Sequence, residues 1–183
     1  KTKTKTETGT ETEVKSVYEN DGSVLITVTA TGDFTIGGDN YHKKDIFSPV
    51  LKSYGDDINF TMQNVKDILA EDDLTIVNFE GTFTTTKYVP SNKKNNEFLF
   101  SIDPKYINVL TDNSIEAVSL ENNHIMDHGD EGYEDTKATL RDAGVVYSNS
   151  TEMGVIEVKG IEIAMLSYLC IDRYNQLWDK VPE

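Results

Sequence analysis

The chain has 183 residues, and its 17 lysines and arginines against 32 aspartates and glutamates give a formal net charge of −15. The length fits one folded core, alone or with a tail, and the composition is that of an ordinary globular protein. The acidic balance argues against nucleic acid as a partner, because phosphate binding needs clustered lysines and arginines. For the same reason, an anionic polymer or phosphorylated substrate would need a metal ion in order to bind.

The first residues, KTKTKTETGTETEVKSVYEN, alternate threonine, lysine and glutamate and offer almost nothing to bury. Such a segment cannot offset the entropy of ordering it, so residues 1–22 are predicted to be a disordered tether and residues 23–183 the folded domain. A charged, threonine-rich tail is similar to the tether of a surface-anchored bacterial protein, which favours an extracellular location at the membrane or cell wall. A frayed terminus is the alternative interpretation.

In the first half of the chain, the β-branched run Val24–Asp33 predicts a strand that ends at Gly32 and Asp33. Apolar residues at helical spacing predict a helix over Thr61–Leu69, with Thr61 as its N-cap. A second buried strand is predicted at Leu74–Gly81, followed by a long polar excursion over Thr82–Glu97.

The second half of the chain shows the same alternation of helices and strands. A helix is predicted to begin at Asp103 and Pro104 and to run to about Asp112, and a strand follows at Ile115–Leu120. A second helix is predicted over residues 130–144, where Gly144 ends it. A short strand at Val145–Tyr147 and a hairpin that turns at Lys159 and Gly160 complete the predicted elements. Strands alternating with helices predict an α/β layered fold.

Polar side chains follow three of the predicted strands. In a parallel sheet these three ends lie on one edge, so Asp33, Glu80, Asn123 and a histidine would converge. Oxygen-rich ligation with some imidazole suits Mg²⁺, Mn²⁺, Fe or Zn²⁺. Such a site activates water and polarises a phosphoryl or carbonyl oxygen, and a histidine beside it can protonate a leaving oxygen.

Each of these features also has an ordinary structural interpretation. Asp33 can belong to a turn after Gly32, and Asn122 and Asn123 tolerate the left-handed backbone of turn residues. Two histidines, His42 and His128, are predicted to be solvated surface residues. The single cysteine, Cys170, follows an apolar run and is predicted to be a buried structural thiol.

Three segments match a known family in order and spacing: TGDFTIGG, VNFEGTFT and VSLENNHIMDHGDEGYEDTKATLRDAGV. They resemble the CapA-type bacterial capsule synthesis proteins, which are accessory proteins of poly-γ-glutamate biosynthesis. The resemblance runs from about Val24 to at least Ser167. It implies a calcineurin-like metallophosphoesterase fold, a mixed β-sheet sandwich flanked by helices.

The resemblance also implies roles for individual residues. Asp33 and Glu80 would be metal ligands, Asn123 the amide ligand, and His124 the proton donor or phosphate contact, with Asp127 orienting His124. The cofactor implied is a divalent metal, with Mn, Mg, Zn and Fe all open. The substrate would be an anionic polymer or a phosphorylated compound bound through that metal.

The chain departs from the family pattern in three places. Thr35 stands where many metallophosphoesterases have the histidine of Asp-x-His, and Glu121 adds a carboxylate at a position that is usually small. The downstream histidine motifs of the family do not occur before Glu183, so a fragment or cleaved product is expected.

Three functions therefore remain open. The first is a surface protein that makes, exports or anchors a capsule polymer and carries a hydrolase site. The second is a non-catalytic scaffold subunit of a membrane polymer-synthase complex. The third is a hydrolase that uses Glu80 and Glu121 as an acid and base pair, which needs their oxygens about 5–10 Å apart.

Overall fold

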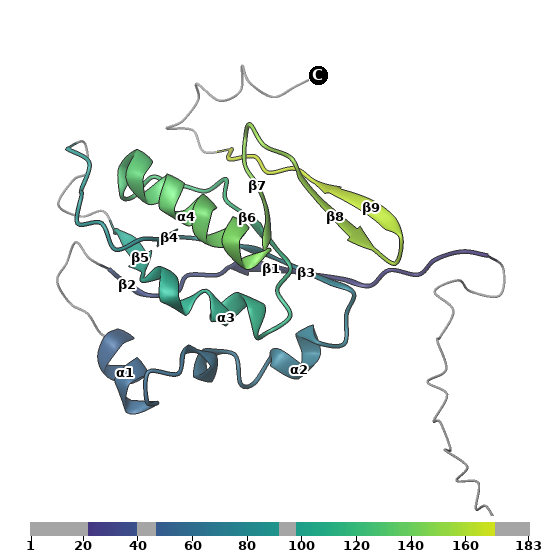
Figure 1. The fold of residues 1–183 in the computed structure, drawn as a ribbon, viewed down its shortest axis with the longest axis horizontal. Helices are drawn as coiled ribbons and strands as arrows, with labels where there is room; N and C mark the ends of the chain where they lie inside the picture. Colours follow the sequence, from purple (N-terminus) through teal and green to yellow (C-terminus); the bar gives the residue numbers. More distant parts are fainter. Residues whose placement is uncertain (1–21, 40–46, 92–97, 171–183) are drawn as a thin grey trace, which may run out of the picture.

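A computed structural model of the chain describes residues 22–39, 47–91 and 98–170. The predicted tether, apart from its last residue, and His42 lie outside these ranges. The central sheet contains β1 (Val28–Asp33), β3 (Leu74–Asn78), β6 (Ala117–Ser119) and β7 (Val146–Ser148) in that order, and all its pairs are parallel (Figure 1). The predicted α/β fold class is confirmed, and the strand ends that carry polar residues share one edge of the sheet.

Smaller elements surround this sheet. A second sheet holds β2 (Gly38–Asp39), β5 (Phe100–Ile102) and β4 (Thr82–Phe83), and a hairpin is formed by β8 (Gly154–Val158) and β9 (Ile161–Met165). The helices are α1 (Phe47–Ser53), η1 (Ile58–Thr61), α2 (Lys66–Leu69), η2 (Pro104–Tyr106), α3 (Asn108–Thr111) and α4 (Gly129–Ala143).

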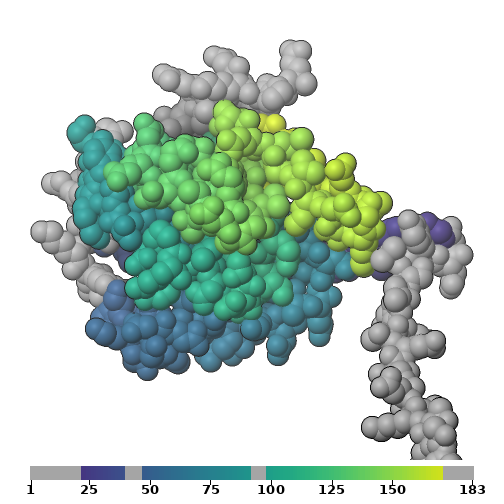
Figure 2. Space-filling view, viewed as in Figure 1, coloured from purple at the N-terminus to yellow at the C-terminus, as the bar shows by residue number. Residues whose placement is uncertain are grey.

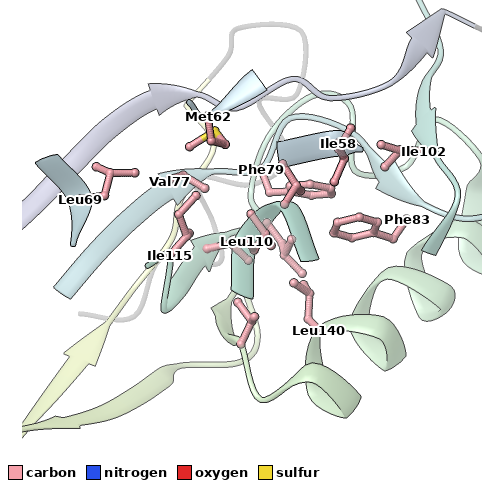
Figure 3. Close-up of a cluster of buried hydrophobic side chains, with 14 of the residues drawn as sticks. Ile58, Met62, Leu69, Val77, Phe79, Phe83, Ile102, Leu110, Ile115 and Leu140 are labelled. Atoms are coloured by element: carbon pink, nitrogen blue, oxygen red, sulfur yellow. The ribbon is translucent and has the colours of Figure 1, made fainter. Parts of the chain in front are cut away.

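The two faces of the central sheet are covered differently. Side chains alternate along a strand, so Val77 and Val118 point to one face while Leu74 and Ala117 point to the other. The first face packs against the helices, and the close-up in Figure 3 shows Leu110 and Leu140 among the side chains gathered there. This cluster is the main core of the protein.

Two aromatic rings connect this core to the strand ends. Phe79 and Phe83 are almost fully buried and stack with ring centroids 4.5 Å apart and an interplanar angle of 15° (Figure 3). Phe79 lies directly between Asn78 and Glu80, so its burial anchors the polar segment in which both occur. Stacked aromatic pairs of this kind contribute about 0.5–1.5 kcal/mol beyond their area burial.

The β8–β9 hairpin covers the second face through Val158 and Met165, which pack with Leu74 and Ala117. Its turn residues Lys159 and Gly160 have φ of 52° and 77°, as a two-residue hairpin turn requires. The predicted turn is therefore confirmed. Figure 2 shows the hairpin, in yellow-green, at the end of the described surface next to the start of the chain's first strand.

One ion pair fixes this hairpin to the sheet. The Lys159 ammonium lies 2.7 Å from Asp73 Oδ2 and 2.8 Å from the carbonyl oxygen of Leu25. The same Asp73 oxygen accepts the Thr27 amide at 2.8 Å. The contacts join the hairpin turn to the approaches of β1 and β3.

Four sequence-based predictions need correction. Of the helix predicted over Thr61–Leu69, only Lys66–Leu69 is helical, as α2, while Thr61 is the last residue of η1 and a turn lies between them. Thr61 is not the N-cap, because Val65 precedes α2 and its side chain makes no capping hydrogen bond. His128 is buried, with 1% of its surface exposed, rather than solvated. Cys170 is exposed rather than buried.

The elements α1, β2, β4 and β5 were not predicted, and β4 lies within the predicted polar excursion over Thr82–Glu97. Pro49 and the few apolar residues of α1 gave no helical periodicity, and β2 is two residues long. The helix predicted after Asp103 exists as η2 followed by α3, and the predicted helix over residues 130–144 is observed as α4, with Gly144 in the left-handed region at φ 74°.

Candidate functional site at the strand ends

Hydrogen bonds between side chains join the ends of the neighbouring strands β1, β3 and β6. Asp33 and Asn78 are paired in register, and the Asn78 side-chain amide donates to Asp33 Oδ1 at 2.7 Å. Asn78 is in turn paired with Ser119 of β6. Asp33 is exposed, so the site opens to solvent at the β1 end.

Asn122 joins the ends of β3 and β6, and β1 is joined to them through Asn78. Its side-chain nitrogen donates to Asn78 Oδ1 at 3.1 Å and to the Phe79 carbonyl oxygen at 2.8 Å, and its Oδ1 accepts the His124 amide at 2.9 Å. Only 6% of its surface is exposed. Sequence reasoning treated this residue as a turn asparagine and did not predict these contacts.

The imidazole of His124 lies against the buried carboxylate of Asp127. Its Nδ1 is 2.9 Å from Asp127 Oδ2, and that oxygen also accepts the Phe100 amide at 2.7 Å. The Phe100 ring contacts the imidazole at an interplanar angle of 50°, with centroids 4.5 Å apart. Because a carboxylate beside Nδ1 selects the tautomer in which that nitrogen carries hydrogen, Nε2 is left available for acid–base chemistry.

Glu80 lies on the other side of the imidazole. Its Oε1 is 3.7 Å from His124 Nε2, and its Oε2 accepts the Thr35 hydroxyl at 2.8 Å. Thr35 occupies the position where many metallophosphoesterases have the histidine of Asp-x-His. Its hydroxyl therefore contacts a predicted metal ligand. Gly81, with φ 155°, follows directly and turns the chain into β4.

The three predicted metal ligands differ in their surroundings. Asp33 and Glu80 follow neighbouring strands, whereas Asn123 is exposed and none of the hydrogen bonds described above reaches it. Within the ranges that the structure describes, no three His, Cys, Asp or Glu side chains form a metal-binding group. The donor chemistry, two carboxylates and an amide at adjacent strand ends, still fits a hard divalent cation.

Glu121, the additional carboxylate, has a different partner. Its Oε2 accepts the Ser150 amide at 2.7 Å, in the loop that follows β7. Glu121 thus stabilises that loop through a backbone contact. This arrangement does not support its use with Glu80 as an acid and base pair.

His128 belongs to a structural contact next to the site. Its Nδ1 lies 2.9 Å from the Tyr88 carbonyl oxygen, and among the described residues its buried Nε2 has no partner. The Tyr88 ring covers Gly129, where an added Cβ would lie 2.7 Å from a ring carbon. The segment after β4 is therefore fastened over the beginning of α4.

Comparisons with known proteins identify one family. The family model described as "Bacterial capsule synthesis protein PGA_cap" matches residues 27–182. No curated protein sequence matches the chain. In the described parts of the chain, no helix has both the length and the apolar character needed to cross a membrane.

Proposed function

The chain belongs to the bacterial capsule synthesis protein family, which implies a role in capsule biosynthesis. From this we propose that it makes, exports or anchors poly-γ-glutamate or a similar anionic polymer. We further propose that its strand ends form a metallophosphoesterase-like hydrolase site. Its place would be outside the cell, tethered to the bacterial membrane or cell wall, in contact with membrane synthase subunits.

The observation that supports a hydrolase site is the pairing of His124 with the buried Asp127. A histidine held by a carboxylate on one ring nitrogen can exchange a proton at the other. The Phe100 amide holds the same carboxylate in place, so the orientation of the imidazole is set by backbone as well as side chain. The site lies at the carboxyl ends of parallel strands, where α/β proteins place their chemistry.

In the proposed reaction, a water oxygen bonds to phosphorus or a related electrophilic centre while the ester bond to the leaving group breaks. One proton of this water stays on the product, and the other is released to the solvent, from which His124 recovers the proton that it donates. The proton on His124 Nε2 moves to the leaving oxygen, and Asp127 stabilises the imidazole throughout. Glu80 Oε1 lies 3.7 Å from that nitrogen, on the other side of the imidazole from Asp127.

Asp33, Glu80 and Asn123 are the residues that would hold a divalent cation of the Mn, Mg, Zn or Fe group. When bound, such an ion lowers the pKa of water and polarises a phosphoryl oxygen. Asn78 and Thr35 fix the two carboxylates by hydrogen bonds, which limits the reorganisation needed on binding.

The test is hydrolysis of an aryl phosphate with added Mn²⁺ by the wild-type chain, His124→Ala and Asp127→Asn. Loss of the proton donor should reduce kcat by about 10²–10⁴-fold. Asp67→Asn, an exposed change on α2, is the matched control and should leave kcat unchanged. Equal rates for the wild type and His124→Ala would remove His124 from the mechanism.

A non-catalytic scaffold is the second candidate. The observations that favour it are the exposed position of Asn123 and, within the described residues, the lack of three His, Cys, Asp or Glu side chains grouped to bind a metal. Calorimetric titration with Mn²⁺ and Zn²⁺ separates the two proposals. Heat of binding that is lost in Asp33→Asn favours the hydrolase, whereas absence of binding in the wild-type chain favours the scaffold.

A further inference from the structure

A pocket of about 310 Å³ is lined by residues of α1, β2, β5 and η2 and does not include His124. Figure 1 shows where these four elements lie. Its apolar lining includes the buried Leu51 and Ile102 and the half-buried Phe47 and Tyr106. Protein pockets for small ligands begin at about 300 Å³ and combine apolar walls with a few polar groups. This pocket therefore has the size for a small molecule, and polar atoms make up most of its exposed lining.

One wall of the pocket depends on a close approach of two backbone segments. Gly37 has φ 108°, and a Cβ at this position would lie 2.3 Å from the Ser101 carbonyl oxygen. A residue with a side chain would push this segment away from β5. The pocket wall is thus built into the backbone rather than left by loose side chains.

Charged residues of both signs line the same pocket. The side chains of Lys52 and Asp56 are close in sequence, but neither makes a hydrogen bond or an ion pair with another described residue. Lys105 and Asp103 form a looser pair, with Nζ 3.5 Å from Oδ2. The negative charge of Asp103, and then the nearby Tyr106, raise the pKa of Lys105 above its ordinary value.

From these features we propose that this pocket binds a small zwitterion, namely a free α-amino acid with an aliphatic side chain. Its carboxylate pairs with Lys52, its ammonium pairs with Asp56, and its side chain lies on Leu51 and Ile102. The four charged residues of the lining sum to zero, so a ligand that carries one charge of each sign matches the pocket better than a simple anion. This binding role is separate from the proposed hydrolase.

The experiment is a titration of the full chain with L-leucine, followed by the backbone amide NMR signals of Gly37, Gly38 and Ile102. The single-charge analogues are 4-methylpentanoate, which lacks the ammonium, and 3-methylbutylamine, which lacks the carboxylate. Each should bind at least about tenfold more weakly than leucine, because one charge-assisted contact is lost. The Lys52→Gln and Asp56→Asn variants should weaken leucine binding to a similar extent.

Lys66→Gln is the matched control, because Lys66 is an exposed lysine on α2 and does not line the pocket. It should bind leucine like the wild type. The proposal is overturned if leucine leaves these signals unmoved, if 4-methylpentanoate binds as tightly as leucine, or if Lys52→Gln has no effect. Hydrolysis of the aryl phosphate by Lys52→Gln should equal that of the wild type, so a failure here is distinct from a failure of the hydrolase proposal.

Discussion

At the scale of single residues, the adjacent asparagines Asn122 and Asn123 differ in burial and in hydrogen bonding. Asn122 is buried and makes its contacts with Asn78, Phe79 and His124, whereas Asn123 is exposed. A buried polar group that loses its partners costs free energy, and an exposed one does not. The stability of this edge of the sheet should therefore depend on Asn122.

Replacing Asn122 by alanine should lower the free energy of unfolding by about 2–4 kcal/mol, because the Phe79 carbonyl and the His124 amide lose their partner. Asn123→Ala is the matched control and should change it by no more than about 0.5 kcal/mol. Urea unfolding at neutral pH measures both. Equal losses in the two variants would contradict the assignment of the structural role to Asn122.

The sequence could predict the neighbourhood of the candidate site but not its contacts. Asp33, Glu80 and His124 each follow a strand that is visible as a β-branched or apolar run, so their common edge follows from parallel pairing. The burial of His128 could not be predicted, because its partner Tyr88 comes from a polar segment 40 residues earlier. Such tertiary contacts leave no local pattern.

At the scale of elements, the length and termini of each element decided whether it could be predicted. The buried strand β3 is a continuous run of apolar and β-branched residues, and α4 begins with Asp130 and Glu131 and ends with Arg141 before Gly144. By contrast, η1 and α2 are four residues each, too short for periodicity. The apolar residues Met62, Val65, Ile68 and Leu69 all follow η1, and their spacing predicted a longer helix than the four residues of α2.

The hairpin turn gives a prediction at this scale. Gly160 has φ 77° and open space around its Cα, so Gly160→Ala meets no steric contact but must adopt a left-handed backbone. This change should destabilise the protein by about 1–2 kcal/mol. Gly32, which also has open space but no positive φ, is the control, and Gly32→Ala should not destabilise it. Thermal unfolding compares the two.

The contact between the hairpin and the sheet gives a pH-dependent prediction. The hydrogen bond from Lys159, and then that from the Thr27 amide, lowers the pKa of Asp73 below its ordinary value of 3.8. A carboxyl group whose pKa is lower in the folded state stabilises the fold above the unfolded pKa, and this stabilisation is lost as the pH falls through the folded pKa. Asp73 should therefore stabilise the protein at neutral pH and not in strong acid.

The variant Asp73→Asn tests this expectation. It should lower the urea midpoint at pH 7, and this difference from the wild type should shrink as the pH falls through the folded pKa of Asp73 and its carboxylate is protonated. A midpoint difference between variant and wild type that is the same at pH 7 and in strong acid would show that the charge of Asp73 contributes nothing.

At the scale of the whole molecule, the net charge of −15 should oppose compactness through self-repulsion. Raising NaCl from about 20 mM to about 500 mM screens this repulsion and should raise Tm by roughly 2–4 °C, equivalent to about 1 kcal/mol at this length. Chloride is used because sulfate would also strengthen apolar burial. A Tm that falls with NaCl would mean that attractive ion pairs outweigh the repulsion.

The parallel order of β1, β3, β6 and β7 also has a consequence for biogenesis. Val28 pairs with Leu74, Ile76 with Ala117, and Ala117 with Val146, so every pairing in this sheet joins residues far apart along the polypeptide. During translation, a strand cannot pair until the neighbouring strand has left the ribosome. Nascent chains should therefore engage holdase chaperones until β3 and β6 have left the exit tunnel.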